Sequence, residues 1–533
     1  MPVNNGSFRQ LHLLTYGTPG VQYPTAMQYS EPAVELAIHD VRTLYAINVT
    51  NHVLAGASQV SCESETGNAY YVPEYVFTHL PGGNFVLISL GCDDVRSLGW
   101  LSREWNVPVL FCSSTYPDVY DTDQFPTQVS FGPLDAAQFL QGLFGILAHF
   151  SWTSYAVVHD TASYARVFEA FVMIIKKNLI LAPRFTFVPI DSSVYPRVLF
   201  DKVLDKVQSS ARIVILMMGS KPTRELMVMA EKTGRTTGDY VYLCIEPYRD
   251  FRRPDPLTWR FNDTDDEIAK SAFRSLLHFT SVCFERSAVA DGQLMRRIEQ
   301  QGRVQYGDKY FVNGEVNEYS IAAYYSVMAL AQVTAEMETA AEITNGRTMA
   351  ARFRNRIFTI NDQNVTIGTQ GVRIIDYCLK STSTNSAGSF QAVMRYDVLS
   401  QRLRPVEELK IDWRRPGNFP PPSRPMCGFT GDDPACQSIW NTTSIASVVA
   451  VLTVMLLAAF AAGAWWVNKR ASKSSAEWWN LLPAHYIQTD AARKLSRRES
   501  RISSRYADLG YRLLGRVREM KPFTKPIFVG QLS

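Results

Sequence analysis

The chain has 533 residues, of which 46% are hydrophobic and 20% charged, with 30 Gly, 27 Pro and 8 Cys. This composition excludes collagen-like, disordered and disulfide-scaffold proteins, and the length leaves room for two or three domain-sized cores. The net charge of +4 hides an asymmetry, because residues 468–533 hold 14 Lys or Arg and 5 Asp or Glu and so carry +9. The preceding part has 40 basic and 45 acidic residues, a net −5, and we expect no nucleic-acid partner.

Short apolar runs alternate with amphipathic stretches from about Leu11 to Asp412. The strand candidates are apolar on both faces, as buried parallel strands are, and comprise Asn84–Leu90, Val107–Cys112, Ser154–Val158, Arg212–Met217 and Tyr240–Cys244. The helix candidates are Glu31–Tyr45, Asp93–Trp105, Pro133–His149, Thr161–Lys177, Tyr195–Gln208 and Arg224–Thr233. This alternation predicts an α/β fold with parallel, doubly wound sheets in two lobes, which bind ligands at the carboxyl ends of their strands.

The run Ile445–Val467 contains 23 residues and no charge. At about 1.5 Å per residue such a helix reaches roughly 35 Å, enough to cross a hydrocarbon core of about 30 Å. Trp465 and Trp466 stand where aromatic side chains anchor at a membrane surface, and Lys469 and Arg470 follow them. We therefore predict one transmembrane helix with its carboxyl-terminal side in the cytosol, a single-pass type I protein of the plasma membrane.

Glycosylation sequons agree with this orientation. All five precede the apolar run, and they predict N-glycans at Asn5, Asn48, Asn262, Asn364 and Asn441. All eight cysteines precede it too, as expected of an oxidising exterior and a reducing cytosol. Their spacing shows no Cys/His ligand pattern, so we expect no metal site.

The first residues, MPVNNGSFRQLHLLTYG, contain no apolar core long enough for a secretory signal. A type I membrane protein needs a secretory signal, so we expect either that the sequence is a mature form or that its natural start lies upstream.

The basic tail contains the stretch Arg493–Arg505, which is rich in serine. Ser500 and Ser496 lie beside arginines and are candidates for phosphorylation by a basic-directed kinase. The alternative is an unregulated basic patch held near anionic lipid. The two interpretations are compatible if phosphorylation of these serines weakens the contact of the basic patch with lipid.

No catalytic residues are predicted. The chain contains no G-x-S-x-G, H-E-x-x-H, glycine-rich phosphate loop, H-R-D or D-F-G motif. The eight histidines are scattered, and His39 and His149 are interpreted as structural residues. We therefore expect no enzymatic activity and no cofactor in this chain.

Several stretches resemble receptor guanylyl cyclases and natriuretic peptide receptors in the same order along the chain. The stretches that show this resemblance are Pro32–Val41, Gly91–Leu110 with its W-N-V-P stretch, Phe150–Val158, Gly371–Asp376 and the Pro-rich Pro420–Cys436 with its Cys-x8-Cys loop. Phe523–Leu532 is similar to the first strands of the kinase-homology domain of that family. The resemblance implies a two-lobed ectodomain of the type I periplasmic-binding-protein kind, homodimerisation and an extracellular ligand.

The resemblance also implies specific sites. It places disulfides at Cys62–Cys92 and Cys427–Cys436, and a chloride ion on the backbone amides at Gly91 and Cys92. The alternative for the second site is a plain turn at Gly91 followed by a helix cap at Asp93. The resemblance gives no partners for Cys112, Cys244, Cys283 and Cys378. No cysteine pair lies between Thr161 and Ser210, where natriuretic receptors have a disulfide loop, which leaves the ligand open.

The predicted domains follow from these assignments. Residues 10–415 form the ligand-binding region, with one lobe at about 10–135 and 283–368 and the other at about 136–282 and 369–415. A stalk (416–444), the membrane helix (445–467), the basic tail (468–520) and the start of a kinase-homology domain (521–533) come after it.

The function expected from the resemblance is the extracellular and membrane part of a receptor that controls cyclic GMP. A non-enzymatic clearance or decoy receptor with a short regulatory tail is the first alternative. A cell-surface interaction protein that binds no ligand is the second.

Overall fold

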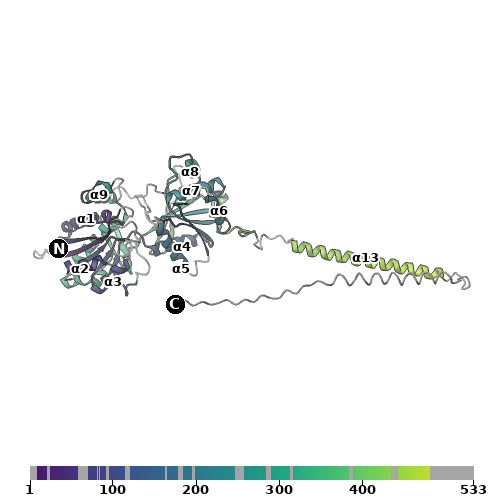
Figure 1. Ribbon diagram of the computed structural model, residues 1–533, viewed down its shortest axis with the longest axis horizontal. Coiled ribbons are helices and arrows are strands. Elements are labelled where there is room, and N and C mark those ends of the chain that lie inside the picture. Colours follow the sequence, from purple (N-terminus) through teal and green to yellow (C-terminus); the bar gives the residue numbers. More distant parts are fainter. Residues whose placement is uncertain are drawn as a thin grey trace. The chain divides into compact units, whose positions relative to one another are not determined.

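The computed structural model describes most of residues 9–479. Not described are 1–8, 21–24, 58–69, 81, 83, 92–94, 114–120, 163–164, 178–183, 195–198, 247–256, 282, 284–289, 312–315, 383–387, 407–408, 432, 434–435, 437–441 and 480–533. The chain divides into two units, Met1–Cys436 and Gln437–Ser533. Each unit is described by itself below (Figure 1).

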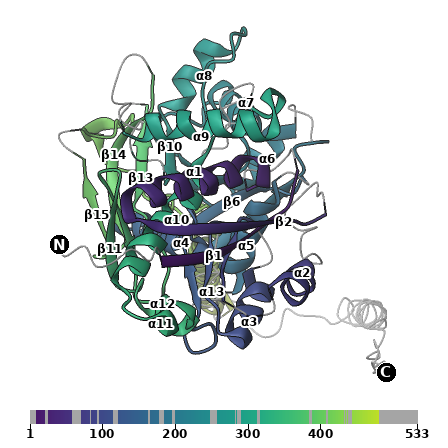
Figure 2. The same ribbon diagram turned by 90° about the vertical axis from the view of Figure 1, so that its left-hand side faces the viewer.

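The first sheet has five parallel strands in the order β2-β1-β3-β4-β5. Their bounds are β1 Arg9–Gly17, β2 Ile47–Ala55, β3 Val86–Ser89, β4 Val109–Phe111 and β5 Gln128–Ser130. One face packs on α1 (Met27–Tyr45), α9 (Ala290–Tyr306) and α10 (Glu318–Glu336), and the other on α2 (Tyr71–His79) and α3 (Val95–Trp105) (Figure 2). We call this sheet with its helices the first core.

Helix α1 shows why these segments fold as they do. Its buried residues Ala33, Val34, Ala37, Ile38 and Val41 recur every three or four positions and form one apolar stripe. The stripe lies in the same buried cluster as residues of β1 and of α10. Helix α10 begins in a capping box in which the Asn317 side chain accepts hydrogen bonds from backbone amides of the first turn.

The second sheet has eight strands in the order β15-β14-β13-β10-β9-β8-β6-β7. Its bounds are β6 Tyr155–Asp160, β7 Phe185–Ile190, β8 Ile213–Met217, β9 Val241–Glu246, β10 Leu276–Thr280, β13 Tyr377–Ser381, β14 Gln391–Asp397 and β15 Arg402–Pro405. The helices with residues in its two buried clusters are α4 Ala136–His149, α5 Arg166–Lys177, α6 Phe200–Gln208, α7 Ser220–Lys232 and α8 Asp266–Phe273. We call this assembly the second core.

The mixed α/β fold with parallel sheets agrees with the prediction, with one correction. Strands β13, β14 and β15 add to the parallel part of the second sheet in antiparallel orientation. The connections between these strands are too short for the crossover that a parallel pair requires.

The chain returns to the first core between β10 and β13. This excursion supplies α9, α10, α11 (Ala340–Thr344), α12 (Gly346–Ala351) and the hairpin of β11 (Arg356–Ile360) and β12 (Gln363–Ile367). Their buried residues, among them Ile298, Tyr324, Met349 and Phe358, belong to the cluster under β1. Three segments therefore connect the cores: 131–135, 281–289 and 368–376.

The stretch Gly371–Asp376, which the resemblance implies to be a strand, does not form one. Only isolated bridges form there, at Val372 and Arg373, because this segment is the third crossing and its backbone bonds to Ser130 instead of joining a ladder. The five other predicted strands exist with shifts of one or two residues at their ends.

The segment Ile411–Ser423, which we call the strap, is fastened to the second core. The Trp152 indole donates a hydrogen bond to the Pro421 carbonyl at 2.8 Å, and the Thr153 amide donates one to the Ser423 hydroxyl at 3.0 Å. The Trp413 ring packs edge-on against the rings of Phe150 and Trp152. Phe150, Trp152 and Thr153 thus hold the strap against the second core.

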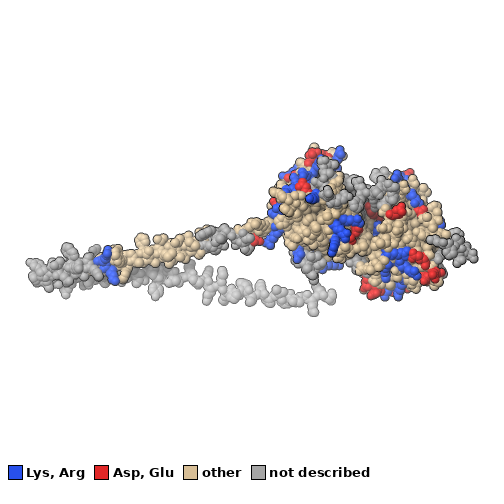
Figure 3. All heavy atoms as spheres, turned by 180° about the vertical axis from the view of Figure 1, so that it is seen from behind, with Lys and Arg blue, Asp and Glu red and all other residues tan. Residues whose placement is uncertain are grey.

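The second unit contains α13 (Thr442–Trp479), a helix of 38 residues. Its part Ile445–Ser472 contains an 18-residue stretch with a mean hydropathy of 2.6 and is the one helix among the described residues that is long and apolar enough to cross a membrane. Figure 3 shows this helix as an uncharged stretch followed by basic side chains. The Lys469 ammonium lies 4.5 Å from the centre of the Trp465 ring, and the Arg470 guanidinium 3.7 Å from that of Trp466.

Candidate functional site

The carboxyl ends of the first sheet bring three hydroxyl groups to one face. Thr18, Ser89 and Ser113 follow or end β1, β3 and β4, at positions that share the face of Leu14, Leu87 and Val109 by strand alternation. All three residues are almost fully buried. The backbone places the last two side by side, because the Cys112 amide donates to the Ser89 carbonyl at 2.9 Å.

Two of these hydroxyls are chemically unsatisfied. The Oγ atoms of Ser89 and Ser113 are buried and have no hydrogen-bond partner among the described residues. A buried hydroxyl without a partner costs about 1–3 kcal/mol, so folded proteins seldom retain one without a reason. At the carboxyl edge of a parallel sheet the reason is a polar ligand group or a water that completes the bonds.

The amino-terminal end of α1 lies at the same edge. The Met27 amide donates to the Thr18 carbonyl at 3.0 Å, and the Gln28 side chain accepts a hydrogen bond from the Gly20 amide at 3.3 Å. One turn later Glu31 is 3% exposed and accepts hydrogen bonds from Tyr306 at 3.2 Å and Gln305 at 3.5 Å. Burial, with the neighbouring Glu35 carboxylate, raises the pKa of Glu31 to about 7.

Two acidic groups at the carboxyl ends of the second sheet have partners within the protein, whereas the buried Nδ1 atom of His159 on β6 has no hydrogen-bond partner among the described residues. The buried Asp160 carboxylate, at the end of β6, accepts hydrogen bonds from the amides of Ala162 and Ser192, both at 3.0 Å. Glu246 ends β9 and lies 2.9 Å from the ring of His278 on β10. The first core offers two neighbouring hydroxyls at this edge that a ligand could engage.

The predicted chloride site is only partly described. Gly91 is buried directly after β3, but Cys92 and the candidate cap Asp93 lie outside the described residues. Chloride binding at Gly91 and Cys92 stays a prediction, as does its alternative.

The structure places the cysteines as follows. It joins Cys427 to Cys436, with their Cα atoms 5.2 Å apart, whereas Cys62 and Cys92 lie outside the described residues. It also joins Cys283 to Cys378, a pair that sequence analysis left unassigned. The remaining two, Cys112 and Cys244, are buried free thiols. Burial raises the pKa of both thiols, that of Cys112 to about 12, which makes them unreactive.

Three of the predicted glycosylation sites are described, and all three are exposed: Asn48, Asn262 and Asn364. Asn5 and Asn441 lie outside the described residues, as do Ser496 and Ser500 in the tail. His39 and His149 are exposed. No group of three or more His, Cys, Asp or Glu side chains suited to a metal ion occurs in the described part of the chain.

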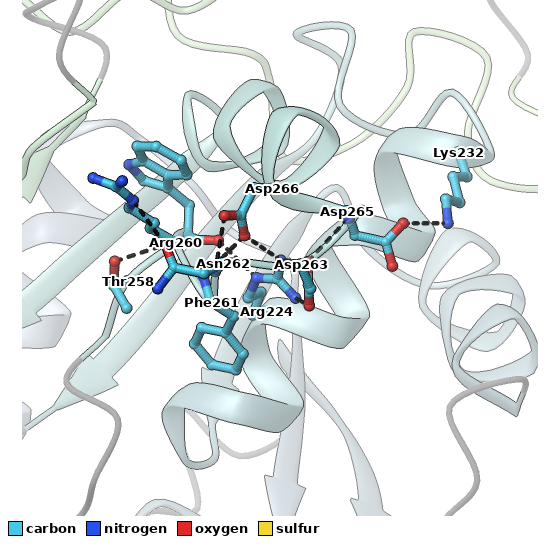
Figure 4. A network of polar contacts seen from close by, with 10 residues as sticks. Arg224, Lys232, Thr258, Arg260, Phe261, Asn262, Asp263, Asp265 and Asp266 are labelled. Carbon is cyan, nitrogen blue, oxygen red and sulfur yellow. Dashed lines mark hydrogen bonds and ion pairs between the residues drawn. The ribbon is translucent and has the colours of Figure 1, made fainter.

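The turn that carries Asn262 is held by a buried arginine that sequence analysis missed (Figure 4). Arg224 on α7 is 2% exposed and donates to both carboxylate oxygens of Asp263, at 3.0 and 2.5 Å. It also donates to Asp266 at 2.8 Å and to the Trp259 carbonyl at 2.7 Å. The Asn262 side chain accepts a hydrogen bond from Arg260 at 3.1 Å and is exposed.

Comparison with known proteins shows what this arrangement belongs to. The model of the "Receptor family ligand binding region" matches residues 30–385, about two thirds of the chain. Guanylate cyclase 2G of Rattus norvegicus is 22% identical over 275 residues, which are 50% of this chain and 24% of that protein. Atrial natriuretic peptide receptor 3 of Mus musculus is 25% identical over 218 residues, 40% of this chain and 39% of that protein.

A longer match is atrial natriuretic peptide receptor 2 of Anguilla japonica, 22% identical over 460 residues, 83% of this chain and 42% of that protein. The chain thus spans less than half the length of each of these relatives. The family match covers most of both cores, from α1 to β13. The chain therefore belongs to the family of receptor ligand-binding regions, as found in receptor guanylyl cyclases and natriuretic peptide receptors.

Proposed function

We propose that this chain is the ligand-binding and membrane-spanning part of a cell-surface receptor that controls cyclic GMP. The observation that carries the proposal is the family match over both α/β cores, followed by one helix apolar enough to cross a membrane. The relatives named guanylate cyclases support an output through cyclic GMP. We further propose that the receptor is a homodimer at the plasma membrane with its ligand-binding unit outside.

The orientation is supported by charge. Lys469 and Arg470 lie at one end of the apolar stretch, beside Trp465 and Trp466. Basic residues directly after a membrane helix favour the cytosolic side, and tryptophans favour the interface. The exposed sequons of the ligand-binding unit belong on the opposite side.

We propose that the ligand binds at the carboxyl edge of the first sheet. Support comes from the unpartnered hydroxyls of Ser89 and Ser113, which a hydrogen-bonding group of the ligand would satisfy. The ligand is therefore expected to present polar groups there, as a peptide backbone or a polar metabolite does.

A chimera tests the proposal. Residues 1–533 are fused to the intracellular part of rat guanylate cyclase 2G and expressed in cultured cells. Cyclic GMP is measured after treatment with atrial natriuretic peptide and with fractionated tissue extracts containing peptides and metabolites. At least one treatment is expected to raise cyclic GMP in these cells and in no cells that lack the chimera.

Two variants locate the site. Replacing Ser89 and Ser113 by alanine is expected to abolish the response and to leave thermal stability equal or higher, because unsatisfied hydroxyls disappear. The control is Ser102→Ala, whose buried hydroxyl contacts the Val107 carbonyl at 2.9 Å and the Thr127 hydroxyl at 2.5 Å. That variant should lose stability and keep the response. An unchanged response in the double alanine variant would place the ligand elsewhere.

The same cells distinguish the clearance receptor. The non-enzymatic alternative would be favoured by two results together. Cells with the native chain would remove a component of one fraction from the medium, and no fraction would raise cyclic GMP through the chimera. If no fraction is bound or depleted by either protein, the receptor proposal fails and the interaction protein gains support.

A further inference from the structure

Helix α13 has two contacts between a cation and an aromatic ring at the end of its apolar stretch, where basic side chains begin (Figure 3). The Lys469 ammonium lies 4.5 Å from the centre of the Trp465 ring, and the Arg470 guanidinium lies 3.7 Å from that of Trp466. In each pair the residues stand four positions apart, so they share one face of the helix. The pairs are offset by one residue and lie about 100° apart around the helix axis. Two neighbouring faces thus present the same combination of ring and cation.

The spacing of these residues along the helix matches the layers of a membrane. Trp465 follows Ile445 by 20 residues, roughly 30 Å along a helix, which is about the thickness of the hydrocarbon core. Lys469 lies one turn later, roughly 6 Å farther along the helix and within the headgroup layer. Because the Cα–Cβ bonds of a helix tilt towards its amino terminus, Lys469 and Arg470 reach back towards the bilayer and over the two rings.

The chain supplies no neighbouring carboxylate for these two cations. Between Asp433 and Glu477 the sequence contains no Asp or Glu, and the side chains of Lys469 and Arg470 are exposed. A ring that covers one face of a guanidinium leaves the N–H groups at its edge able to donate, and a phosphate accepts two of them at once. The two charges therefore suit an anion from outside the chain that carries a phosphate group.

We propose that the Trp465–Lys469 and Trp466–Arg470 pairs, which we call the interfacial pairs, bind the headgroup of an anionic phospholipid in the cytosolic leaflet. The phosphate accepts hydrogen bonds from the two cations, and the acyl chains lie along the rings, which are 63% and 52% exposed. The positive-inside rule accounts for basic residues on this side of a membrane helix, but it demands no aromatic partner for each of them. The proposal rests on the orientation proposed above and is independent of the extracellular ligand.

A comparison of two lipids tests the interfacial pairs. The full chain is purified in detergent and treated with N-glycosidase, and native mass spectrometry counts the lipids that it retains. Phosphatidylserine and phosphatidylcholine with identical acyl chains are added in turn. Phosphatidylserine should be retained at a concentration roughly tenfold lower, because only its headgroup carries a net negative charge. Equal retention of the two lipids would overturn the proposal.

The soluble headgroup separates a lipid site from a site for free phosphate groups. Glycerophosphoserine has the charges of phosphatidylserine but no acyl chains to lie along the rings. At equal concentration it is expected to leave the bound lipid in place. Displacement of the lipid under these conditions would mean that the cations bind any phosphate group, and a lipid site would be excluded.

Two double variants separate the roles of charge and ring. Lys469→Gln with Arg470→Gln removes both charges, and the preference for phosphatidylserine over phosphatidylcholine should fall below about twofold. Trp465→Leu with Trp466→Leu keeps the charges and removes the rings. The preference should then fall by about threefold or more, because the cations lose the partners that hold them at the headgroup layer. An unchanged preference in the leucine variant would indicate diffuse attraction and contradict a built site.

The matched control removes one Arg and one Lys from the ligand-binding unit. Arg402→Gln with Lys410→Gln alters two exposed residues and changes the net charge by the same amount, so it should leave the lipid preference as it is. An equal fall in this control would assign the preference to total charge and refute the interfacial pairs. The orientation has its own readout in the glycosylation of Asn262. A native chain without a glycan there would overturn the assignment to the cytosolic leaflet, whereas the lipid comparison tests the pairs themselves.

Discussion

Glu31 is a buried acidic side chain on helix α1 that faces helix α9. Its partners are the neutral side chains of Tyr306 and Gln305, and the Glu35 carboxylate lies close enough to raise its pKa further. Since burial disfavours the charged form, the folded protein holds a proton on Glu31 up to about pH 7. The unfolded chain releases that proton near its ordinary value of 4.5.

The stability of the first core should therefore depend on pH. Because the pKa is raised in the folded state, the contribution of Glu31 is fully present below about pH 4.5 and is lost as the pH rises through about 7. Glu31→Gln removes the proton equilibrium and keeps the shape. We expect the variant to match the native chain at pH 5 and to melt at higher temperature at pH 8. Equal pH profiles of the melting temperature for both proteins would contradict this explanation.

Arg224 is the largest almost fully buried charged side chain, and its charge is matched by Asp263 and Asp266. Its planar guanidinium also reaches the Trp259 carbonyl and stacks over the Phe261 ring at 4.5 Å. A lysine could not reproduce this set of bonds, because it lacks the fork of donors.

We expect Arg224→Met to destabilise the second core by about 1–3 kcal/mol, since the Trp259 carbonyl and the Asp266 carboxylate, 17% exposed, lose a buried donor. Arg224→Lys should recover little of that loss. Local hydrogen exchange of α7 and α8 measures the effect. The control is Arg395→Met, whose ion pair with Asp376 is half exposed and should be worth less than about 1 kcal/mol. Similar losses for the two methionine variants would refute the role of burial.

Residue chemistry was the least predictable level from sequence. The sequon at Asn262 is recognisable as a motif in the sequence. Arg224 on α7 looks like an ordinary helix residue there, because only the fold brings Asp263 to it. The hydroxyls of Ser89 and Ser113 look like any serines, and their missing partners are visible only in three dimensions. The Cys283–Cys378 pair, 95 residues apart, had no spacing rule to reveal it.

At the scale of elements, sequence worked where burial is uniform. Strands such as β3 and β8 are buried at every position and almost wholly apolar, and they were predicted because a sheet covered on both faces demands that pattern. Strand β1 was missed, since Arg, Gln, His, Thr and Tyr interrupt its apolar residues. The antiparallel strands β13–β15 were missed as well; β14 is only partly buried and β15 has no buried residue, so neither shows a continuous apolar run.

The strap depends on one backbone position. Gly238, before β9, has a φ of 96°, and a Cβ there would lie 2.6 Å from the Arg414 carbonyl and 2.7 Å from that of Trp413. Only glycine allows both the left-handed conformation and this close approach.

Gly238→Ala should therefore release the strap. We expect faster cleavage by trypsin after Arg414 and a loss of roughly 2 kcal/mol or more in stability. Gly234→Ala is the matched control, because Gly234 also has a positive φ of 72° but no atom within 4 Å of the added Cβ. It should cost only about 1 kcal/mol and leave the cleavage rate unchanged. Equal cleavage rates in the two variants would exclude a steric role for Gly238.

At the scale of the whole molecule, the apolar helix and the exposed sequons predict the same membrane topology. If the ligand-binding unit lies outside the cell, the asparagines that face solvent there are accessible to the glycosylation machinery. Asn48, Asn262 and Asn364 are all exposed in the structure.

We expect Asn262→Gln, made in the full chain expressed in animal cells, to increase electrophoretic mobility by the mass of one glycan. Treatment with N-glycosidase should remove the difference between variant and native chain. The control is Asn355→Gln, which replaces an asparagine outside any sequon and should not alter mobility. Native chain that shows no shift on N-glycosidase treatment would contradict the orientation.

The contacts of the strap also determine where the ligand-binding unit can be truncated. A secreted version that ends at Asp412 would strip the Pro421 carbonyl from the Trp152 indole and the Ser423 hydroxyl from the Thr153 amide, and would uncover the rings that Trp413 covers. A version that ends after Cys436 keeps all of these contacts and the small disulfide loop. The natural border for crystallisation or ligand screening therefore lies close to the membrane, after residues that look like a linker in sequence but belong to the fold.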